Sequence, residues 1–371
     1  MGCCTGGASS ASGRQIAPAP QPKLRDGTLY IVTASSDSTA RIWNVETGEC
    51  ADAIRGHDGK VLSCSRSPVG NLFVTTGLDK TAKVWSEEGE CLQTLTGHTS
   101  YVTCCSFSPD GMTVVTGSGD AELRLWDVQT GACLKTLKGH EQIVTSCAFS
   151  PDGSKIVTAS KDRKVRIWSV VGGNTVKTLK ESHAESHTVT GCSFSPDGTR
   201  IALTTWTERN NCKLYDAVTG NRVLTLTGHT DVALSCVFSS SGLQIATTSS
   251  DRTCRVWNAS TGECISTLEG HADAVGSCAF SSDTAHICTV SRDMTAKVWD
   301  WRKKEPVCVR TLVGHTGALN SCAFLLMASA KVPLSPGARG GFAIEPGPAA
   351  EWTPVKRDVF RTSSFAWYPS V

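Results

Sequence analysis

Residues 97–127 read GHTSYVTCCSFSPDGMTVVTGSGDAELRLWD and contain the main features that recur along this chain of 371 residues. The stretch begins with Gly97-His98 and ends with Trp126-Asp127. Between them, runs of alternating apolar and polar residues flank the sequence Ser-Pro-Asp-Gly at 108–111, which has proline and glycine where a tight turn needs them. Because a period of two residues is typical of half-buried strands, the stretch predicts short β-strands joined by tight turns.

The same features repeat along the chain at a nearly constant interval. The Gly-His dipeptide occurs at 56–57, 97–98, 139–140, 228–229, 270–271 and 314–315. The aromatic residue has counterparts 41, 42 or 47 residues apart, at Trp43, Trp85, Trp126, Trp168, Tyr215, Trp257 and Trp299. This period and the Gly-His…Trp-Asp signature resemble the WD-repeat family over about residues 28–324, and the resemblance implies a β-propeller in which each repeat supplies one small sheet.

Each unit reads as four strands, here called a to d from the centre of a propeller outward. Strand a is of the type at 144–150, strand b of the type at 155–160, and strand c ends at Trp168. Strand d is of the type at 132–137. No stretch has a helical period, so the predicted fold class is all-β.

The order of the strands predicts how the ring closes. The first b strand begins at about Leu29, but the first a strand begins only at Val61, and a seventh a strand at 319–324 follows the last d strand. An open propeller would expose strand edges that invite aggregation. We therefore predict a seven-bladed β-propeller of four-stranded blades over residues 28–324, closed by strand 319–324, which completes blade one. Residues 1–27 are predicted to be a flexible leader, and residues 325–371, rich in Pro, Gly and Ala, a disordered tail or a loose partner-binding segment.

His, Thr, Asp and Trp recur within the repeats at fixed spacing, with Thr 18, Asp 22 and Trp 28 residues after the histidine. The resemblance implies a buried hydrogen-bonded tetrad that ties strands b and c to the loop before strand a. A catalytic constellation would occur once and open to a cleft, so repeated copies favour a structural role. The tetrads are His57, Thr75, Asp79, Trp85; His98, Thr116, Asp120, Trp126; His140, Thr158, Asp162, Trp168; His229, Thr247, Asp251, Trp257; His271, Thr289, Asp293, Trp299; and, across the chain ends, His315 with Thr33, Asp37 and Trp43.

Blade five departs from this pattern. Leu203 replaces the threonine, Tyr215 replaces the tryptophan, and no aspartate precedes strand c, where Arg209 stands instead. His187 keeps its distance from Tyr215 only because a shortening and an insertion cancel. The departure is either tolerated drift or a binding edge that includes Trp206 and Arg209.

By resemblance, the rim formed by the d–a loops and b–c turns is the protein-binding face. A mixture of basic and aromatic residues there suits the hot spots of a protein interface. The predicted rim residues are Lys60, Tyr101, Lys161, Arg163, Trp206, Arg209 and Arg292.

Most of the eighteen cysteines follow the repeat rather than forming CxxC pairs, so we interpret them as small, buried, reduced side chains. Seven share a strand-a position, at Cys64, Cys105, Cys147, Cys192, Cys236, Cys278 and Cys322. Five share a strand-d position, at Cys50, Cys91, Cys133, Cys264 and Cys308.

Composition argues against several classes of partner. With 36 Lys and Arg against 34 Asp and Glu, the net charge of +2 gives no reason to expect nucleic acid. A basic residue stands two positions before every strand-c aromatic, but such a set is spread around a ring and forms no groove: Arg41, Lys83, Arg124, Arg166, Lys213, Arg255 and Lys297. The a strands carry Val, Ser, Thr and Cys, so we expect no enzyme, cofactor, metal or small-molecule substrate.

The N-terminus sets the expected location. No apolar run approaches the ~20 residues of a membrane-spanning helix, and no secretory signal is present, so we expect a cytoplasmic protein. We also expect the propeller to be monomeric. Met1-Gly2-Cys3-Cys4 resembles a lipidation signal, with myristate on Gly2 and palmitate on Cys3 or Cys4, although Gly6 stands where Ser or Thr is usual. The alternatives are membrane association through this acylated terminus and a leader without lipid.

Our leading functional hypothesis is a non-catalytic scaffold or adaptor that binds other proteins. The alternative is a substrate receptor of a cullin ubiquitin ligase, because residues 287–302, ending in Trp-Asp-Trp-Arg, resemble the DWD box of receptors that dock through damaged-DNA-binding protein 1. Arg302 would make the adaptor contact. Val290 and Ala296 depart from that box, which has a small residue at the first position and a larger apolar one at the second.

Overall fold

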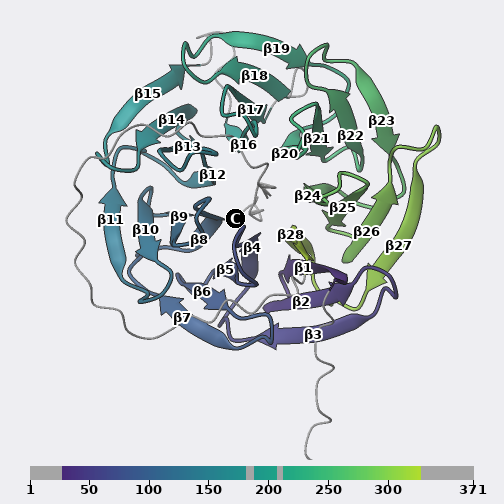
Figure 1. The fold of residues 1–371 in the computed structure, drawn as a ribbon, viewed down its shortest axis with the longest axis horizontal. Coiled ribbons are helices and arrows are strands. Elements are labelled where there is room, and N and C mark those ends of the chain that lie inside the picture. Colours follow the sequence, from purple (N-terminus) through teal and green to yellow (C-terminus); the bar gives the residue numbers. More distant parts are fainter. Residues whose placement is uncertain (1–26, 181–187, 207–211, 327–371) are drawn as a thin grey trace, which may run out of the picture.

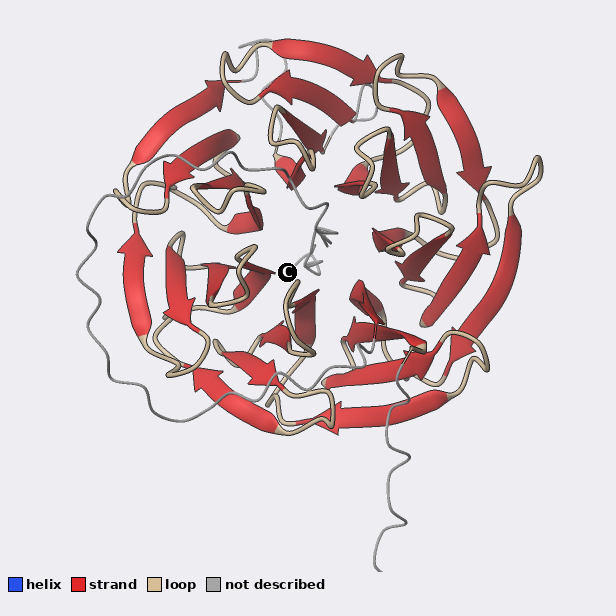
Figure 2. Cartoon of the chain, viewed as in Figure 1, coloured by secondary structure: helices blue, strands red, loops and turns tan. Residues whose placement is uncertain are grey.

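The structure is a computed structural model that describes residues 27–180, 188–206 and 212–326. These residues form seven antiparallel four-stranded sheets arranged around one axis, and no described residue is helical (Figures 1 and 2). The prediction of an all-β, seven-bladed propeller is confirmed.

Each sheet runs from an inner a strand to an outer d strand. The a strands are β4 (Val61–Arg66), β8 (Val102–Phe107), β12 (Val144–Phe149), β16 (Val189–Phe194), β20 (Ala233–Phe238), β24 (Val275–Phe280) and β28 (Leu319–Leu326). The b strands are β1 (Leu29–Ser35), β5 (Phe73–Gly77), β9 (Thr113–Ser118), β13 (Lys155–Ser160), β17 (Arg200–Thr205), β21 (Gln244–Ser249) and β25 (His286–Ser291). The c strands are β2 (Thr39–Asn44), β6 (Ala82–Trp85), β10 (Leu123–Asp127), β14 (Lys164–Ser169), β18 (Cys212–Asp216), β22 (Cys254–Asn258) and β26 (Thr295–Asp300). The d strands are β3 (Cys50–Arg55), β7 (Cys91–Leu95), β11 (Cys133–Leu137), β15 (Thr175–Lys180), β19 (Arg222–Leu226), β23 (Cys264–Leu268) and β27 (Val307–Val313).

The ring closes through the last strand of the chain. β28 pairs antiparallel with β1, so blade one has the order β28-β1-β2-β3, as predicted. Figure 1 shows the yellow C-terminal strand beside the purple N-terminal strands. β28 runs two residues past the predicted end at Phe324, because Leu29 and Tyr30 offer backbone partners for Leu326 and Leu325.

The hydrophobic core lies between successive blades rather than within them. One cluster combines Cys104, Val115 and Leu125 of blade three with Ile156 and Trp168 of blade four. The closing interface is built in the same way, since a single cluster joins residues of β25 and β26 to residues of β1, β2 and β28. A blade therefore buries its apolar surface only when both of its neighbours are in place.

Hydrogen bonds between the innermost strands add to this packing. Thr103, Thr145 and Thr190 each donate a side-chain hydrogen bond to a backbone carbonyl of the next blade, at 2.6, 2.7 and 2.8 Å. Asn320 of β28 does the same at 2.7 Å, to the carbonyl of Val61. The closing strand is thus tied to blade two as well as to blade seven.

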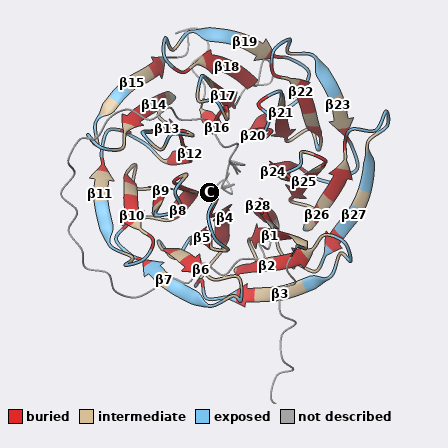
Figure 3. Cartoon of the chain, viewed as in Figure 1, coloured by how far each residue is buried: buried red, intermediate tan, exposed pale blue. Residues whose placement is uncertain are grey.

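Burial falls from the centre to the circumference, and this corrects one prediction about the cysteines (Figure 3). The seven strand-a cysteines have no exposed surface, and burial raises the pKa of Cys64 and Cys192 to about 12. The five strand-d cysteines are exposed, so the prediction that they are buried was wrong. Strand d is the outer edge of each sheet, and one of its faces meets solvent. All cysteines of the described residues are free thiols.

Removing the closing strand should destabilise the whole ring. A chain truncated after Leu312 loses His315 and β28, and with β28 the side chains of Leu319, Cys322 and Phe324 that pack in one cluster with Ile31 and Trp43. A loss of about 5 kcal/mol would lower Tm by roughly 10 °C, measured by differential scanning calorimetry. The matched control ends after Leu326 and keeps every strand. Equal Tm values for the truncation after Leu312 and the full chain would contradict the importance of this closure.

Candidate functional site

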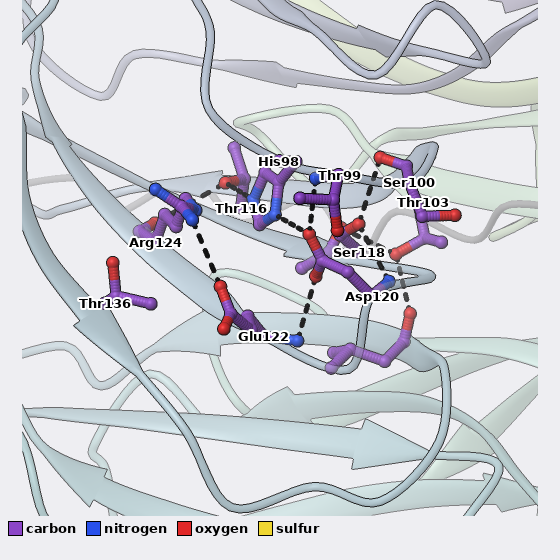
Figure 4. A network of polar contacts seen from close by, with 12 residues as sticks. His98, Thr99, Ser100, Thr103, Thr116, Ser118, Asp120, Glu122, Arg124 and Thr136 are labelled. Atoms are coloured by element: carbon purple, nitrogen blue, oxygen red, sulfur yellow. Dashed lines mark hydrogen bonds and ion pairs between the residues drawn. The ribbon is translucent and has the colours of Figure 1, made fainter.

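The tetrad of blade three shows how the loops of the rim are held, and Figure 4 draws three of its members, His98, Thr116 and Asp120. Trp126 Nε1 donates to Thr116 Oγ1 at 2.8 Å, and Thr116 Oγ1 lies 2.8 Å from His98 Nε2. His98 Nδ1 lies 2.9 Å from Asp120 Oδ2. Every donor and acceptor of this hydrogen-bond network has a partner when Thr116 Oγ1 donates to His98 Nε2 and a neutral His98 donates its Nδ1 proton to Asp120.

Each tetrad glycine stands before the histidine because the indole occupies the adjacent space. A Cβ atom on Gly56 would lie 2.8 Å from the ring of Trp85, and one on Gly139 would lie 3.0 Å from the ring of Trp168. The Gly-His dipeptide is therefore the local sequence that lets the d–a loop cross directly over the tryptophan.

The structure brings the residues of all six predicted tetrads together. In blades two, four, six and seven, the distances of the three hydrogen bonds are 2.7 or 2.8 Å. In blade one, His315 lies 2.8 Å from Thr33 Oγ1 and 2.7 Å from Asp37 Oδ2, and Trp43 Nε1 donates to Thr33 at 2.8 Å. The sixth tetrad thus joins the two ends of the propeller.

The aspartates connect the tetrads to the backbone of the rim. Asp120 accepts the backbone N–H of Thr99 in the d–a loop and that of Glu122 at the start of the c strand. Burial alone would raise the pKa of Asp79, but hydrogen bonds, first among them that from His57, outweigh it and bring the pKa to about 2. The pKa of Asp37 is also about 2, because hydrogen bonds from Thr39 and His315 outweigh the effect of burial. Each of these carboxylates is ionised at neutral pH and fixes a loop to a turn.

This geometry supports no catalytic role for the tetrads. Thr116 and Thr158 have no exposed surface, and both hydroxyls already lie between a tryptophan and a histidine. A nucleophile needs a hydroxyl that substrate can reach. Among the described residues, no group of three or more His, Cys, Asp or Glu side chains is placed to hold a metal ion.

Blade five has four strands, but its described residues form no tetrad. Leu203 of β17 and Tyr215 of β18 are buried in the positions of Thr and Trp. His187 and Arg209 lie outside the described residues. Lys213 is only 1% exposed, whereas Arg166 at the same place in blade four extends over the Trp168 ring, 6.0 Å from its centroid, and is partly exposed.

Seven backbone hydrogen bonds define a ring of loop residues, here called the inner rim. In each blade, the residue after the b strand donates its backbone N–H to the carbonyl of the residue at or just before the start of the a strand, at 2.8–3.0 Å. The pairs, with the acceptor first, are Ala318–Ser36, Lys60–Leu78, Tyr101–Gly119, Ile143–Lys161, Thr188–Trp206, Val232–Ser250 and Ala274–Arg292.

The inner rim collects most of the predicted rim residues. Lys60, Tyr101, Lys161, Trp206 and Arg292 all belong to it. Arg163 is two residues further along, exposed, and has a φ of 66° in its b–c turn. Arg209 lies outside the described residues.

Sequence reasoning missed several exposed residues of the same rim. Leu78 is 38% exposed and holds the position of Lys161. Lys80, Arg252 and Met294 hold the left-handed position of Arg163, with φ of 66–69°. Their position, one residue before or after a tetrad aspartate, was the available signal.

The Trp-Asp-Trp-Arg motif spans the end of β26, with Trp299 and Asp300, and the start of the c–d loop of blade seven, with Trp301 and Arg302, on the side opposite the inner rim. Trp301 is buried against Phe280 and donates its indole N–H to the carbonyl of Thr284 at 2.9 Å. Arg302 is exposed next to it, near the Asp283 carboxylate, whose pKa it helps to lower. Trp301 therefore anchors the loop that presents Arg302.

The N-terminal motif cannot be placed. Gly2, Cys3 and Cys4 lie outside the described residues. The described part of the chain contains no helix of the length and hydropathy needed to cross a membrane.

The fold and the buried tetrads define the class: a β-propeller built from tetrad-bearing repeats. The chain belongs to the WD40 family, since the model described as "WD domain, G-beta repeat" matches residues 48–86, 89–127, 131–169, 173–216, 220–258 and 262–300. Each matched segment starts near a c–d turn and combines strand d of one blade with strands a, b and c of the next. Blade one is split between the two ends of the propeller, so six matched repeats correspond to seven blades.

Individual relatives match over short segments. Apoptotic protease-activating factor 1 of Rattus norvegicus is 45% identical over 65 residues, which is 18% of this chain and 5% of the relative. The p21-activated protein kinase-interacting protein 1-like of Gallus gallus is 37% identical over 60 residues, 16% of each chain. WD repeat and SOCS box-containing protein 1 of Homo sapiens is 36% identical over 62 residues, 16% of this chain and 15% of the relative. This chain thus matches less than a fifth of each relative's length.

Truncating a tetrad tryptophan should destabilise the protein strongly. Trp126→Ala leaves a cavity between blades two and three and removes the donor to Thr116. We expect the free energy of unfolding to fall by about 3–5 kcal/mol, measured by urea denaturation. Trp126→Phe is the matched control, because it keeps much of the volume and loses mainly the hydrogen bond, at about 1–2 kcal/mol. An unchanged urea midpoint for Trp126→Ala would contradict the role given to the tetrads.

Acidification should destabilise the protein in two stages. Burial lowers the pKa of His271 and His315 below 6.5, so between pH 7.5 and 5.5 the unfolded chain binds more protons than the folded chain. Stability must then fall as pH falls. A second loss should follow between pH 4 and 2, where aspartates with the ordinary pKa of 3.8 are protonated in the unfolded chain while Asp79, with a pKa of about 2, stays ionised in the folded one.

The measurement is Tm across pH 7.5 to 2.5. Asp79→Asn is the control, since it should be less stable at neutral pH and should lose part of the acidic stage. A Tm that rises between pH 7.5 and 5.5 would contradict this assignment of neutral histidines.

Proposed function

We propose that this protein is a non-catalytic scaffold that binds other proteins through the rim of d–a loops and b–c turns. The WD40 propeller fold is consistent with this role, because proteins of this fold generally act as scaffolds. The observation that carries the proposal is the inner rim, a regular hydrogen-bonded frame that holds Trp206, which is 51% exposed, together with Tyr101 and the basic residues Lys60, Lys161 and Arg292.

The frame matters because it fixes the rim before any partner arrives. The carboxylate of Asp162 accepts the backbone N–H of Glu141 in the loop and of Lys164 at the start of β14. Loops fixed in this way lose little conformational freedom on binding, which favours affinity. The name of the Gallus gallus relative, a kinase-interacting protein, also points to protein partners.

We further propose that the protein acts as a monomeric propeller in the cytoplasm. Acylation of Gly2 together with Cys3 or Cys4 would tether it to a membrane, since two acyl chains anchor a protein stably where one does not. The partners would then be assembled at the membrane surface.

The second candidate function is a substrate receptor of a cullin ubiquitin ligase. Arg302 is exposed on a loop that Trp301 anchors, as an adaptor contact requires. The two departures from the motif compensate each other in volume, because Val290 and Ala296 are direct cross-strand partners in one buried cluster. A named relative also combines WD repeats with a SOCS box. Loss of ligase-adaptor binding on Arg302→Ala, with Lys303→Ala as the matched control, would favour this function over the scaffold.

Proximity labelling in the native cell tests the leading proposal. The wild-type chain should label a reproducible set of proteins, and the double variant Tyr101→Ala, Trp206→Ala should lose part of this set at unchanged Tm, because both residues belong to the rim. Gly2→Ala should remove membrane proteins from the set if the N-terminus is acylated. The outer-edge variant Leu134→Ala is the control, since Leu134 is exposed on β11 far from the rim. A set that no rim variant changes would contradict binding through this rim.

A further inference from the structure

We propose that the inner rim over blades two to five binds an extended acidic segment of a partner protein, one that also carries bulky apolar side chains. The inference rests on the proposed scaffold function and specifies the chemistry of the partner. It is carried by the unequal distribution of side chains around the inner rim.

Large side chains gather on one arc of the ring. Blades two to five contribute Lys60, Leu78, Tyr101, Ile143, Lys161 and Trp206, with Thr188 and Gly119 as the only small members. Blades six, seven and one contribute small or buried residues, apart from Arg292: Val232, Ser250, Ala274, Ala318 and Ser36. A partner that binds through contacts with side chains would therefore make most of these contacts on blades two to five.

Tyr101 forms a platform in the middle of this arc. A Cβ atom on Gly119 would lie 2.8 Å from Tyr101 Cζ and 2.9 Å from Cε2, so the phenol ring rests directly on the glycine. In the other blades this position carries a side chain, for example Leu78 or Lys161. Only blade three can seat an aromatic ring there, between the cations of blades two and four.

Basic residues accompany the apolar residues of this arc both in the inner rim and in the b–c turns. Lys60 and Lys161 stand in the inner rim, and Lys80 and Arg163 extend from the b–c turns of the same two blades. In the described part of the chain, no ion pair holds Lys60 or Lys80.

Most nearby acids are already committed. Glu122 pairs with Arg124 and Lys138, and Glu141 pairs with Lys164. The carboxylates of Asp79, Asp120 and Asp162 face their histidines. Lys80 and Arg163 are exposed in their turns, and Asp58, in the loop before Lys60, is an exposed acid of the same rim.

The arrangement of basic and apolar residues along this arc fits an extended polypeptide. Successive side chains of such a segment could place acidic groups near Lys60, Lys80, Lys161 and Arg163, and apolar groups on Leu78, Tyr101, Ile143 and Trp206. The aliphatic Leu78 and Ile143 give a nucleic-acid backbone nothing to bind, so we favour a protein segment over an oligonucleotide. The energy should concentrate on Tyr101 and Trp206, since central aromatic residues dominate protein interfaces.

The test is selection of a random dodecapeptide library on the full chain, followed by fluorescence anisotropy of the enriched peptides. The proposal expects peptides with several Asp or Glu and with Leu, Phe or Trp. Lys161→Glu combined with Arg163→Glu should weaken their binding about fiftyfold or more, and Tyr101→Ala about tenfold or more. Binding should also weaken when salt is raised from 0.05 to 0.5 M.

Arg252→Glu is the matched control, because Arg252 holds the turn position of Arg163 in blade six, outside the arc. It should change affinity less than about twofold, and every variant should keep the Tm of the wild type. Enrichment of peptides without an acidic excess, binding that the Lys161 and Arg163 variant does not weaken, or a single-stranded oligonucleotide that binds more tightly than the peptides would each overturn the proposal.

The result also separates this inference from the scaffold function. If proximity-labelled partners depend on the rim but the selected peptides are not acidic, the scaffold remains and the acidic segment is wrong. If neither the peptides nor the labelled partners respond to any rim variant, both proposals fail.

Discussion

The hydrogen bond from the d–a loop histidine to the b–c turn aspartate is the interaction on which the rest of the structure depends. The loop leaves the d strand of one blade and enters the a strand of the next, so this bond joins a crossing between blades to a turn within a blade. In blade three, Asp120 is bonded to His98 and accepts hydrogen bonds from two backbone N–H groups. His98 is also bonded to Thr116, which accepts a hydrogen bond from the buried Trp126. Because every member is paired, the network can be buried without the cost of unsatisfied polar groups, and it fixes loop, turn and core together.

That network would have little value in an open ring. Each cluster of the core lies between two blades, so an unclosed propeller would leave the clusters at its two ends half-formed. The ring is closed because the C-terminal strand β28 pairs with the N-terminal strand β1 and completes blade one. His315 then makes the same contacts with Thr33 and Asp37 that local histidines make elsewhere, although nearly the whole propeller separates them in sequence. Ring closure and tetrad formation are thus one structural event in blade one.

The sequence was sufficient for most of the fold, and the reason is physical. A spacing of 18, 22 and 28 residues holds only if strand lengths and turns are nearly fixed, so the tetrads, the blade number and the closing strand could all be predicted. What depends on neighbours outside the repeat could not. Cys133 is exposed because it lies on an edge strand. β28 extends to Leu326 because Leu29 offers it a backbone partner. Lys213 is buried because its surroundings in blade five differ from those in the other blades. Leu78 and Lys80 were missed for a different reason: their place beside Asp79 was visible in the sequence, but their exposure depends on the fold of the turn.

The b–c turns show how the tetrads stabilise strained backbone. Ser38, Lys80, Ala121, Arg163, Arg252 and Met294 all adopt left-handed backbone, with φ of 66–70°. Such a conformation costs a residue with a side chain about 1 kcal/mol relative to glycine, and glycine holds none of these six positions. The adjacent aspartates, each bonded to a histidine and to backbone N–H groups, supply the stability that offsets this strain. Lys80, Arg163 and Met294 are exposed at these strained positions, so their side chains belong to the surface of the rim rather than to the core. The buried tetrads thus stabilise, at the rim, a backbone conformation that the exposed residues there disfavour by themselves.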